Sequence, residues 1–552
     1  MRKAAIAAAV CVGCTFVWLA LAHGQFGGGG PWAQAGGDAQ LTGWQQNEPR
    51  INLQNANDIQ MQWQIKLKAS ADDMPGPTEP LFVGRVITEK GFKDMAVVLS
   101  GNNIYDVDYE LGRMVWQKHF DIRERQSAPQ VGACPDGQFA VMTIQPPPNF
   151  ARFLALRGRG PGRGGRGGAP FRPPAPVPLS QRRVGGTASG GSPFGLRGLY
   201  VLTSNGDLHE LLVTNGENYG FPVKVLPYRN SNLSAMTMSG SKIFFNTTGN
   251  CGGSMKVGGI WDQEPNGTWS VDMSSPKYPV ASYDTHNINA TGLSGPAQST
   301  DGKTLYVTTG GGHADVVTGG VYPNSVVAVD TSTMQVEDYY QPSGPAATAE
   351  TNINVSPVVF SYGGRDLIAA YVEGGRLALL DSKSLGGANH HTPLAITAPI
   401  AENGGSGAWG RLASAELNNQ RWIFVSVQGA RLSDITFPTT HGATPNGSVV
   451  AFEVQNQAGK TVLTPEWVSP DMVNPSPAAI ASGIVFTLAN GKAGSSNARL
   501  YALNATTGAP LYNSGNEISS PGYFSSLSVS LGHVLFVTED HTLYSYGISI
   551  EH

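Results

Sequence analysis

Short apolar runs separated by polar turns recur along the chain. Residues 500–515 read LYALNATTGAPLYNSG: an apolar run, a polar turn with Gly, and a second run. Related phrases stand at 104–116, 326–340 and 377–386. The runs are rich in Val, Ile, Leu, Tyr and Phe and are bounded by Gly, Asn, Asp and Ser, which is typical of strands joined by hairpin turns. Beyond the N-terminus no capped segment with helical periodicity predicts a long helix. We therefore expect an all-β protein.

Each phrase follows another pair of predicted strands. Residues 355–381, VSPVVFSYGGRDLIAAYVEGGRLALLD, give three strands joined by two Gly-Gly turns, and 475–508 and 524–548 repeat this order. We expect eight such units, whose third-strand phrases fall near residues 105, 200, 260, 327, 377, 449, 500 and 543. Four-stranded units repeated radially form a β-propeller. A row of β-sandwiches would need linkers between the repeats, and none is seen.

The chain end predicts how the ring closes. The last unit lacks a fourth strand, and residues 59–68, IQMQWQIKLK, have no other partner. The pattern therefore predicts a single eight-bladed propeller over residues 23–552, closed by this N-terminal strand.

Composition agrees with a turn-rich chain and narrows the partners. The 552 residues include 70 Gly and 37 Pro, whereas charged residues make up only 14%. A net charge of −4 does not favour nucleic acid as a partner. After the N-terminus no apolar run is long enough to span a bilayer.

The first 22 residues resemble an export signal. Met1-Arg2-Lys3 precede an apolar run that ends in Ala20-Leu21-Ala22, a pattern that signal peptidase accepts. We expect cleavage near residue 23 and a periplasmic or secreted protein. The alternatives are an uncleaved anchor and a lipoprotein modified at Cys14. Cleavage would leave two cysteines, Cys134 and Cys251, which allow one internal disulfide.

Residues 146–197 interrupt the second unit. They are dominated by Gly, Pro and Arg, a composition that buries too little apolar surface to order itself. We expect a solvated, disordered insertion. The alternative is an arm for anionic polysaccharide or lipid headgroups.

Two stretches carry a family resemblance. Residues 32–67, WAQAGGDAQLTGWQQNEPRINLQNANDIQMQWQIKL, resemble the opening of the quinoprotein alcohol dehydrogenases and their relatives, the PQQ-like eight-bladed propellers. LYALNATTGAPLY resembles the repeat of that family. The resemblance covers nearly the whole mature chain. It implies the fold strongly and the chemistry less so, because one fold hosts many functions.

The resemblance also implies a defined set of groups around the quinone. In the family a Ca²⁺ ion polarises the quinone, an Asp accepts the alcohol proton, and cations balance the charge of the cofactor. A Trp forms the floor of the quinone site, opposite a disulfide between adjacent cysteines.

Most of this set is missing from the matching positions. Cys134 has no adjacent cysteine, and 249–259, which matches the metal-binding loop, contains no carboxylate. The segment that matches the catalytic loop, 347–357, offers Glu350 and Asn352 but no Asp. Glu373 stands where the family has a cation and would repel an anionic cofactor.

One group persists at its matching position. Trp409 remains, in the loop GGSGAWGRLAS. With four losses against this one retention, we expect no PQQ and no metal.

Further polar residues are candidates for ligand binding. His313 and Asp315 lie in the Gly-rich stretch 309–320, and Asp284, His286 and Asn287 lie in YDTHNINATG. The alternative is that these loops bond to themselves. We interpret His390 and His391 as solvated, and we expect three tryptophans to pack between blades: Trp116, Trp269 and Trp467.

The resemblance places Cys134 and Cys251 near the cofactor mouth, on neighbouring blades. An axial disulfide and two separate buried thiols both stay open.

Two function classes follow from the sequence. The first is an exported propeller that binds a ligand or protein as a scaffold. The second is a quinoprotein-type alcohol or sugar dehydrogenase with an altered site, using PQQ, Ca²⁺ and Glu350 as base. We favour the first.

Overall fold

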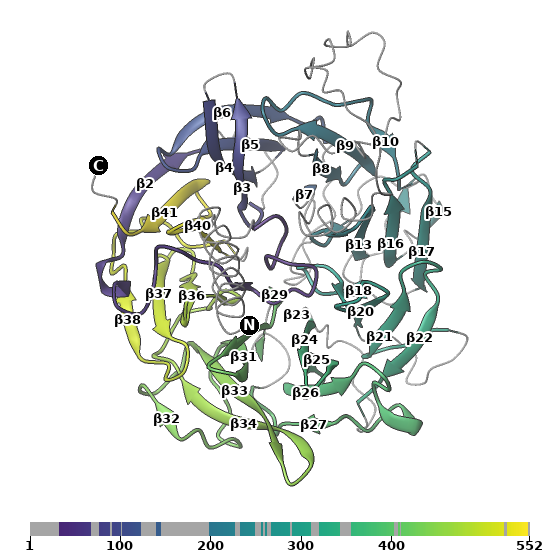
Figure 1. Cartoon of the computed structure of the whole chain (residues 1–552), viewed down its shortest axis with the longest axis vertical. Helices are drawn as coiled ribbons and strands as arrows, with labels where there is room; N and C mark the ends of the chain where they lie inside the picture. The colour runs from purple at the N-terminus through teal and green to yellow at the C-terminus, as the bar shows by residue number, and fades with distance from the viewer. Residues whose placement is uncertain are drawn as a thin grey trace, which may run out of the picture.

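The computed structural model describes most of the predicted mature chain. The described residues are 32–67, 77–88, 91–100, 102–122, 140–144, 198–226, 232–248, 256–257, 260–261, 266–275, 277–286, 290–310, 320–342, 355–401, 407–408, 410–523 and 527–549. Their regular structure is strand apart from 3-10 turns at Ala56–Asp58 and Gly387–Asn389. Antiparallel sheets, mostly four-stranded, are arranged around one axis as eight blades (Figure 1). The predicted eight-bladed propeller is confirmed.

The first half of the chain forms blades 1 to 4. Blade 1 contains β3 (Leu81–Thr88), β4 (Gly91–Ser100), β5 (Asn103–Asp108) and β6 (Arg113–His119). Blade 2 contains β7 (Ala140–Ile144), β8 (Gly198–Thr203), β9 (Asp207–Leu212) and β10 (Val223–Lys224). Blade 3 contains β11 (Asn232–Leu233), β12 (Thr237–Ser239), β13 (Lys242–Thr248), β16 (Asn266–Asp272) and β17 (Val280–His286), with a small hairpin of β14 (Lys256–Val257) and β15 (Ile260–Trp261). Blade 4 contains β18 (Ala290–Thr291), β19 (Ala297–Gln298), β20 (Thr304–Thr309), β21 (Val326–Asp330) and β22 (Val336–Tyr340).

The second half forms blades 5 to 8. Blade 5 contains β24 (Val358–Tyr362), β25 (Arg365–Val372), β26 (Arg376–Asp381) and β27 (Ala395–Ile396). Blade 6 contains β28 (Gly407–Ala408), β30 (Ala413–Leu417), β31 (Gln420–Gln428), β33 (Gly447–Gln457), β34 (Lys460–Val468) and β32 (Thr439–Thr440). A parallel pair, β23 (Val355–Ser356) and β29 (Gly410–Arg411), joins blades 5 and 6. Blade 7 contains β35 (Ala479–Ala481), β36 (Ile484–Ala489), β37 (Arg499–Asn504) and β38 (Pro510–Asn513), with β1 (Trp44–Gln45) beside β35. Blade 8 contains β39 (Ser528–Ser530), β40 (His533–Val537), β41 (Thr542–Gly547) and β2 (Gln60–Lys66).

Two predicted strand positions differ from the structure. The phrase near residue 200 lies on β8, the second strand of blade 2, and its third strand is β9. The phrase near residue 260 lies in the β14–β15 hairpin, and the third strand of blade 3 begins at Asn266. In both blades an additional segment of chain is inserted between two strands of the sheet. A short apolar run near such a segment therefore does not identify the third strand.

The ring closes as the sequence predicts. Strand β2 pairs antiparallel with β41, from Gln60 opposite Gly547 to Lys66 opposite Thr542. An N-terminal strand thereby completes the C-terminal blade and covers the edge that β41 would otherwise present.

The recurring T-G phrase joins one blade to the next. On β34 the Trp467 indole donates its Nε1–H to the carbonyl of Ala505 in blade 7, at 3.0 Å. Gly508 follows in the same turn with φ +70, and a Cβ added there would lie 2.5 Å from the indole. Only glycine allows this approach. Trp63 and Trp116 make the same contact with the turns around Gly112 and Gly216.

The predicted packing roles of the tryptophans can now be checked. The contacts of Trp116 and Trp467 confirm that they pack between blades. Trp269 donates instead to Thr247 Oγ1 within blade 3, at 2.8 Å, and packs against a core cluster of blades 2 and 3.

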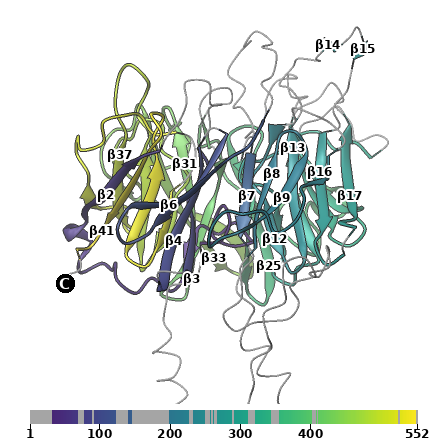
Figure 2. The ribbon, with the colours of Figure 1, turned by 90° about the horizontal axis from the view of Figure 1, so that it is seen from above.

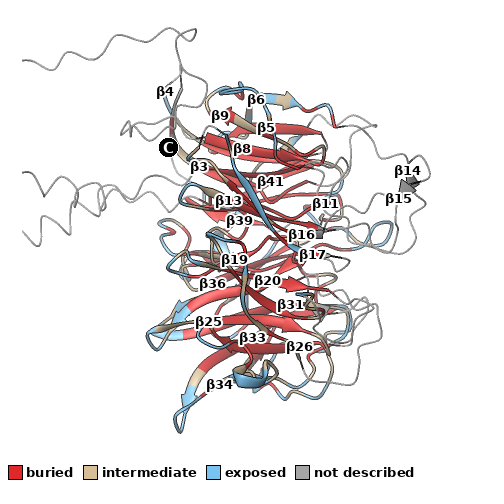
Figure 3. Cartoon of the chain, turned by 90° about the vertical axis from the view of Figure 1, so that its right-hand side faces the viewer, coloured by how far each residue is buried: buried red, intermediate tan, exposed pale blue. Residues whose placement is uncertain are grey.

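The disc has two faces. The turns that join the first strand of a blade to the second, and the third to the fourth, lie on one face, which we call the lower face. We call the opposite face the upper face. Figure 2 shows the disc from the side, with the β14–β15 hairpin on the upper face. The strands are largely buried between blades, and the exposed residues gather at the hairpin tips (Figure 3). Among the described residues no helix is long and apolar enough to cross a membrane.

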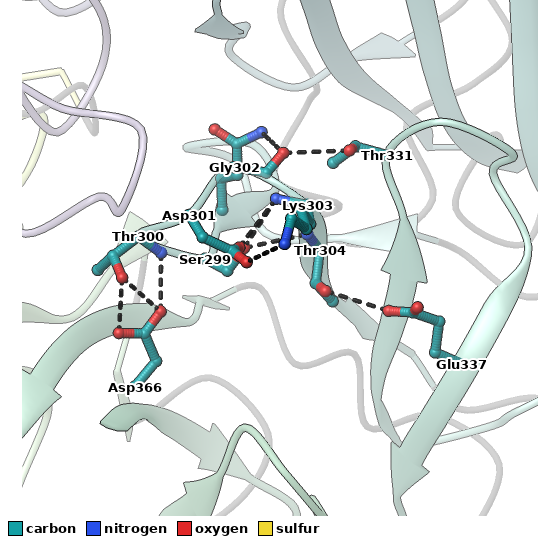
Figure 4. A network of polar contacts seen from close by, with 10 residues as sticks. Ser299, Thr300, Asp301, Gly302, Lys303, Thr304, Thr331, Glu337 and Asp366 are labelled. Carbon is teal, nitrogen blue, oxygen red and sulfur yellow. Dashed lines mark hydrogen bonds and ion pairs between the residues drawn. The ribbon is translucent and has the colours of Figure 1, made fainter. Parts of the chain in front are cut away.

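Side-chain hydrogen bonds also link neighbouring blades on the lower face. In the first turn of blade 4, the backbone N–H and the hydroxyl of Thr300 both donate to the Asp366 carboxylate of blade 5 (Figure 4). In blade 4 itself, Thr304 Oγ1 donates to Glu337 at 3.1 Å. Such exposed contacts align neighbouring blades more than they stabilise them.

Residues 32–45, which we call the strap, run inside the ring. The strap appears as the purple segment in the middle of Figure 1. It makes a hydrogen bond with the first strand of each blade in chain order. Six blade N–H groups donate to strap carbonyls: Phe82 to Trp32, Ile144 to Ala33, Gln298 to Ala39, Val359 to Gln40, Ser414 to Thr42 and Ile480 to Gly43. Side chains make the other two contacts, with Met238 N–H donating to Gln34 and Gln45 donating to Val529 O.

Candidate functional site

The upper face at blades 5 and 6 carries several charged side chains. Glu373 opens the turn between β25 and β26, and Arg376 Nε donates to the Glu373 carbonyl at 3.4 Å. Burial raises the pKa of the Glu373 carboxyl, whereas the positive charge of Arg376 lowers it. A half-buried carboxylate therefore stands where the family resemblance implies a cation.

A glycine holds this turn against the next segment of the chain. Gly375 has φ +67, and a Cβ added there would lie 1.9 Å from the Ala401 carbonyl. Ala401 forms a β-bridge with Arg431, whose guanidinium donates to the carbonyls of Leu432 and Ile435. Blades 5 and 6 thus form one continuous stretch of the upper face.

Tyr371 lies beneath Glu373 on β25. Burial raises the pKa of its hydroxyl to about 12, and this hydroxyl has no hydrogen-bond partner among the described residues. A phenol with this pKa stays protonated at neutral pH, so it acts as a hydrogen-bonding group and not as a base.

The strap surrounds a buried ion pair. Arg411 Nη1 lies 2.7 Å from Glu79 Oε2, and the two side chains are 0% and 7% exposed. Glu79 Oε1 accepts hydrogen bonds from Trp32 Nε1 at 2.5 Å and from Gly36 N–H at 3.0 Å. This pair links blade 1 to blade 6 through the strap.

One edge of the Arg411 guanidinium is unpaired. Nε and Nη2 are buried and have no hydrogen-bond partner among the described residues. Asp38 lies close enough for the charge of Arg411 to lower its pKa, but burial raises that pKa more. A buried polar edge of this kind is commonly satisfied by an ordered water.

The structure describes three of the predicted site residues. Glu373 lies on the upper turn of blade 5, whereas Asp284 and His286 lie on β17, the outermost strand of blade 3. Asp284 is exposed and pairs across the sheet with Gly267. Blade 4 separates these two positions, so the structure does not bring Glu373 and Asp284 together.

The other predicted site residues lie outside the described residues: Glu350, Asn352, Trp409, His313, Asp315, Asn287, Cys134 and Cys251. The same holds for residues 1–31 and for the whole of the predicted insertion, 146–197, which lies between β7 and β8 in the chain. Trp409 is flanked in the chain by β28 and β29.

Most residues that match the family's cofactor-binding loops lie outside the described residues. Among them, no group of three or more His, Cys, Asp or Glu side chains is arranged to hold a metal ion. Glu373 adds negative charge at the position of the implied cation, so the described residues do not fit an anionic quinone.

Sequence reasoning missed both Arg376 and the Glu79–Arg411 pair. Arg376 is only three residues from Glu373, and a search limited to matching family positions passed over it. Glu79 and Arg411 are 332 residues apart. Only the ring arrangement brings such distant residues together, so no local pattern indicates the pair.

Comparisons with known proteins bear on the fold. No family model and no curated protein matches the sequence. Among solved structures, the quinohemoprotein alcohol dehydrogenase from Pseudomonas putida HK5 is similar at a TM-score of 0.57 and 12% identity, over 95% of this chain and 81% of that chain.

Two further structures agree. The quinohemoprotein alcohol dehydrogenase from Comamonas testosteroni gives a TM-score of 0.55 at 12% identity, over 95% of this chain and 81% of that chain. A europium-containing methanol dehydrogenase gives 0.54 at 10% identity, over 94% and 98%. Identities this low establish the fold and not the activity. The chain therefore has the eight-bladed propeller fold of the PQQ-type quinoprotein alcohol dehydrogenases.

Proposed function

We propose that this protein is an exported propeller that binds a ligand or a protein partner on its upper face and does not hold the quinone of the enzymes whose fold it shares. The observation that carries the proposal is Glu373. A half-buried carboxyl group whose pKa is raised by burial already resists ionisation. An anionic cofactor beside it would add like-charge repulsion.

The two ends of the axis support an upper binding face. The strap lies inside the ring with several contacts close to the turns of the lower face, and it holds Glu79 through Trp32 and Gly36. On the upper face Glu373 and Arg376, in a turn of blade 5, and Arg431, in a loop of blade 6, present charge of both signs. Polar groups of both signs on connecting loops suit recognition of a partner.

Cofactor reconstitution tests the first half of the proposal. The mature protein is incubated with PQQ and Ca²⁺, and bound quinone is measured by absorbance after gel filtration. We expect none, and no dye-linked alcohol oxidation. Stoichiometric quinone with turnover would overturn the proposal and favour the dehydrogenase with Glu350 as base.

Site-specific photo-crosslinking tests the second half. A photoreactive residue replaces Glu373 on the upper face or, as a matched control, Gln457, which is exposed on the lower-face hairpin of blade 6. In the source cell, discrete adducts are expected from position 373 and not from position 457. The opposite pattern would move the binding surface to the lower face.

A further inference from the structure

The strap touches every blade, and it makes at least one hydrogen bond with the first strand of each. The eight hydrogen bonds follow the order of the chain, from Phe82 in blade 1 to Val529 in blade 8. Each is made to the first strand of a blade, whose inner edge faces the axis. Several contact residues, among them Met238, Ile480 and Val529, lie close to the turns of the lower face.

The strap keeps its curved path by bending back on itself. Gly43 N–H donates to the Gly36 carbonyl at 2.9 Å, and Leu41 N–H donates to Asp38 O at 3.1 Å. Leu41 has φ +58 and is buried in the core between blades 4 and 5. Gly43 has φ +63, and a Cβ added there would lie 2.9 Å from the Ala478 carbonyl.

The buried ion pair fills the space that the strap encircles. Glu79 is held from one side by Trp32 and by the Gly36 backbone. Arg411 passes between Gly36 and Gly43, since Cβ atoms added there would lie 3.3 Å from its Cδ and 3.7 Å from its Nε. The pair can form only when blades 1 and 6 and the strap are all in place.

We propose that the strap docks as one cooperative unit that closes the lower end of the axis, with the Glu79–Arg411 pair as its lock. A single backbone hydrogen bond contributes little net free energy. Contacts joined in one chain form together, because the first contact holds the rest at high effective concentration. All eight partners are available only in a closed ring. The strap therefore docks only when the ring is complete. Once it has docked, a ligand can approach the axis from the upper face.

Hydrogen exchange on the full chain reads out this unit directly. The readout is the set of seven blade amides that donate to the strap: Phe82, Ile144, Met238, Gln298, Val359, Ser414 and Ile480. In Gly43→Ala we expect all seven to exchange about tenfold faster, because alanine is strained in the left-handed conformation. Amides inside the blades, such as Phe486 on β36, should keep their protection.

A matched glycine controls for backbone strain. Gly363→Ala changes a left-handed glycine on the lower face, with φ +60 and no atom within 4 Å of an added Cβ. It should leave the seven amides unchanged. If Gly43→Ala accelerates only Ser414 and Ile480, the strap does not dock as a unit and the proposal is overturned. Acceleration of Phe486 to the same degree would overturn it as well, because the strap would then not be separable from the fold.

The lock has its own test. Glu79→Gln keeps an acceptor for Trp32 and Gly36 but removes the charge that faces Arg411, so the same seven amides should exchange faster. Asp381→Asn removes the charge that pairs with Arg365 near the lower face of blade 5, and should leave them unchanged. If Glu79→Gln leaves the seven amides unchanged, the pair is not the lock.

Discussion

The two ends of the propeller axis are built differently. At the lower end, glycine turns, indole contacts and the strap pair most of their polar groups with one another, although Asp38 has a raised pKa and one edge of the Arg411 guanidinium is unpaired among the described residues. At the upper end, Glu373 lies half-buried with a raised pKa, Arg376 and Arg431 donate to local backbone carbonyls, and the Arg431 guanidinium also lies over the Phe437 ring. The contacts of the strap join all eight blades and so stabilise the ring, whereas the half-buried Glu373 carboxyl has only the local charge of Arg376 to offset the cost of its burial. Such costs are characteristic of binding surfaces.

The largest difference between the ends should appear when one arginine is removed from each. Arg411→Met leaves Glu79 buried without its partner, and unfolding free energy should fall by about 3–5 kcal/mol. Arg376→Met on the upper face should change it by less than about 1 kcal/mol. Urea unfolding followed by tryptophan fluorescence measures both. Equal losses would show that the upper face is as structural as the lower.

The blade joints give a second test of the lower end. Gly508→Ala forces a left-handed alanine against the Trp467 indole, so strain and overpacking together should cost about 3 kcal/mol. Gly515→Ala has φ +61 but no atom within 4 Å of the added Cβ, and should cost about 1 kcal/mol. Thermal unfolding distinguishes the two. A matching loss in both variants would mean that the indole contact adds nothing beyond backbone strain.

The sequence predicted those features of the fold that recur in every blade. Strand alternation and T-G turns identified the blades, and the lone strand at residues 59–68 identified the closure, because each depends on local pattern and count. It could not predict the strap contacts. Residues 32–45 show no alternation of apolar and polar positions, and their hydrogen-bond partners are spread along the chain from Phe82 to Val529. Only the closed ring sets that geometry.

The candidate site shows the same limit. Glu373 was found because one residue type stood out at a position of known chemistry. The Glu79–Arg411 pair was missed because neither residue is unusual in its own segment. The pair matters because both side chains are buried and face each other, and neither their burial nor their pairing can be predicted from one position in the sequence.

A pH comparison sharpens the contrast, beginning at the lower face. Glu110, in the third turn of blade 1, has its carboxylate 3.7 Å from His533 Nε2 of blade 8 and 3.0 Å from Arg50 Nη1. These contacts lower the pKa of Glu110 to about 2, the contact with His533 most strongly. A lowered folded pKa gives stability that is present above the ordinary value of 4.5 and is lost as the pH falls toward 2.

Glu110→Gln should therefore destabilise the protein at pH 7 by about 1 kcal/mol, after allowing for solvent screening of this partly exposed group. Urea unfolding at pH 7, 4 and 2 follows the difference between variant and wild type, which should shrink as the pH falls. A constant difference would show that the lost contact is not ionic.

The smallest effect is expected at Glu373, with the opposite sign. Burial raises the folded pKa of this carboxyl above its ordinary value of 4.5. Its contribution to stability is full below pH 4.5 and is lost as the pH rises through the folded pKa, where the half-buried group must ionise. Glu373→Gln removes that ionisation, so the variant should exceed the wild type at pH 7 by a few tenths of a kcal/mol. At pH 4 the two should agree. Urea midpoints at both pH values measure the difference. If Glu373→Gln instead lost stability at pH 7, the charge of Arg376 would compensate the buried charge of Glu373 fully. The polar groups of the upper end would then be paired within the chain as those of the lower end are.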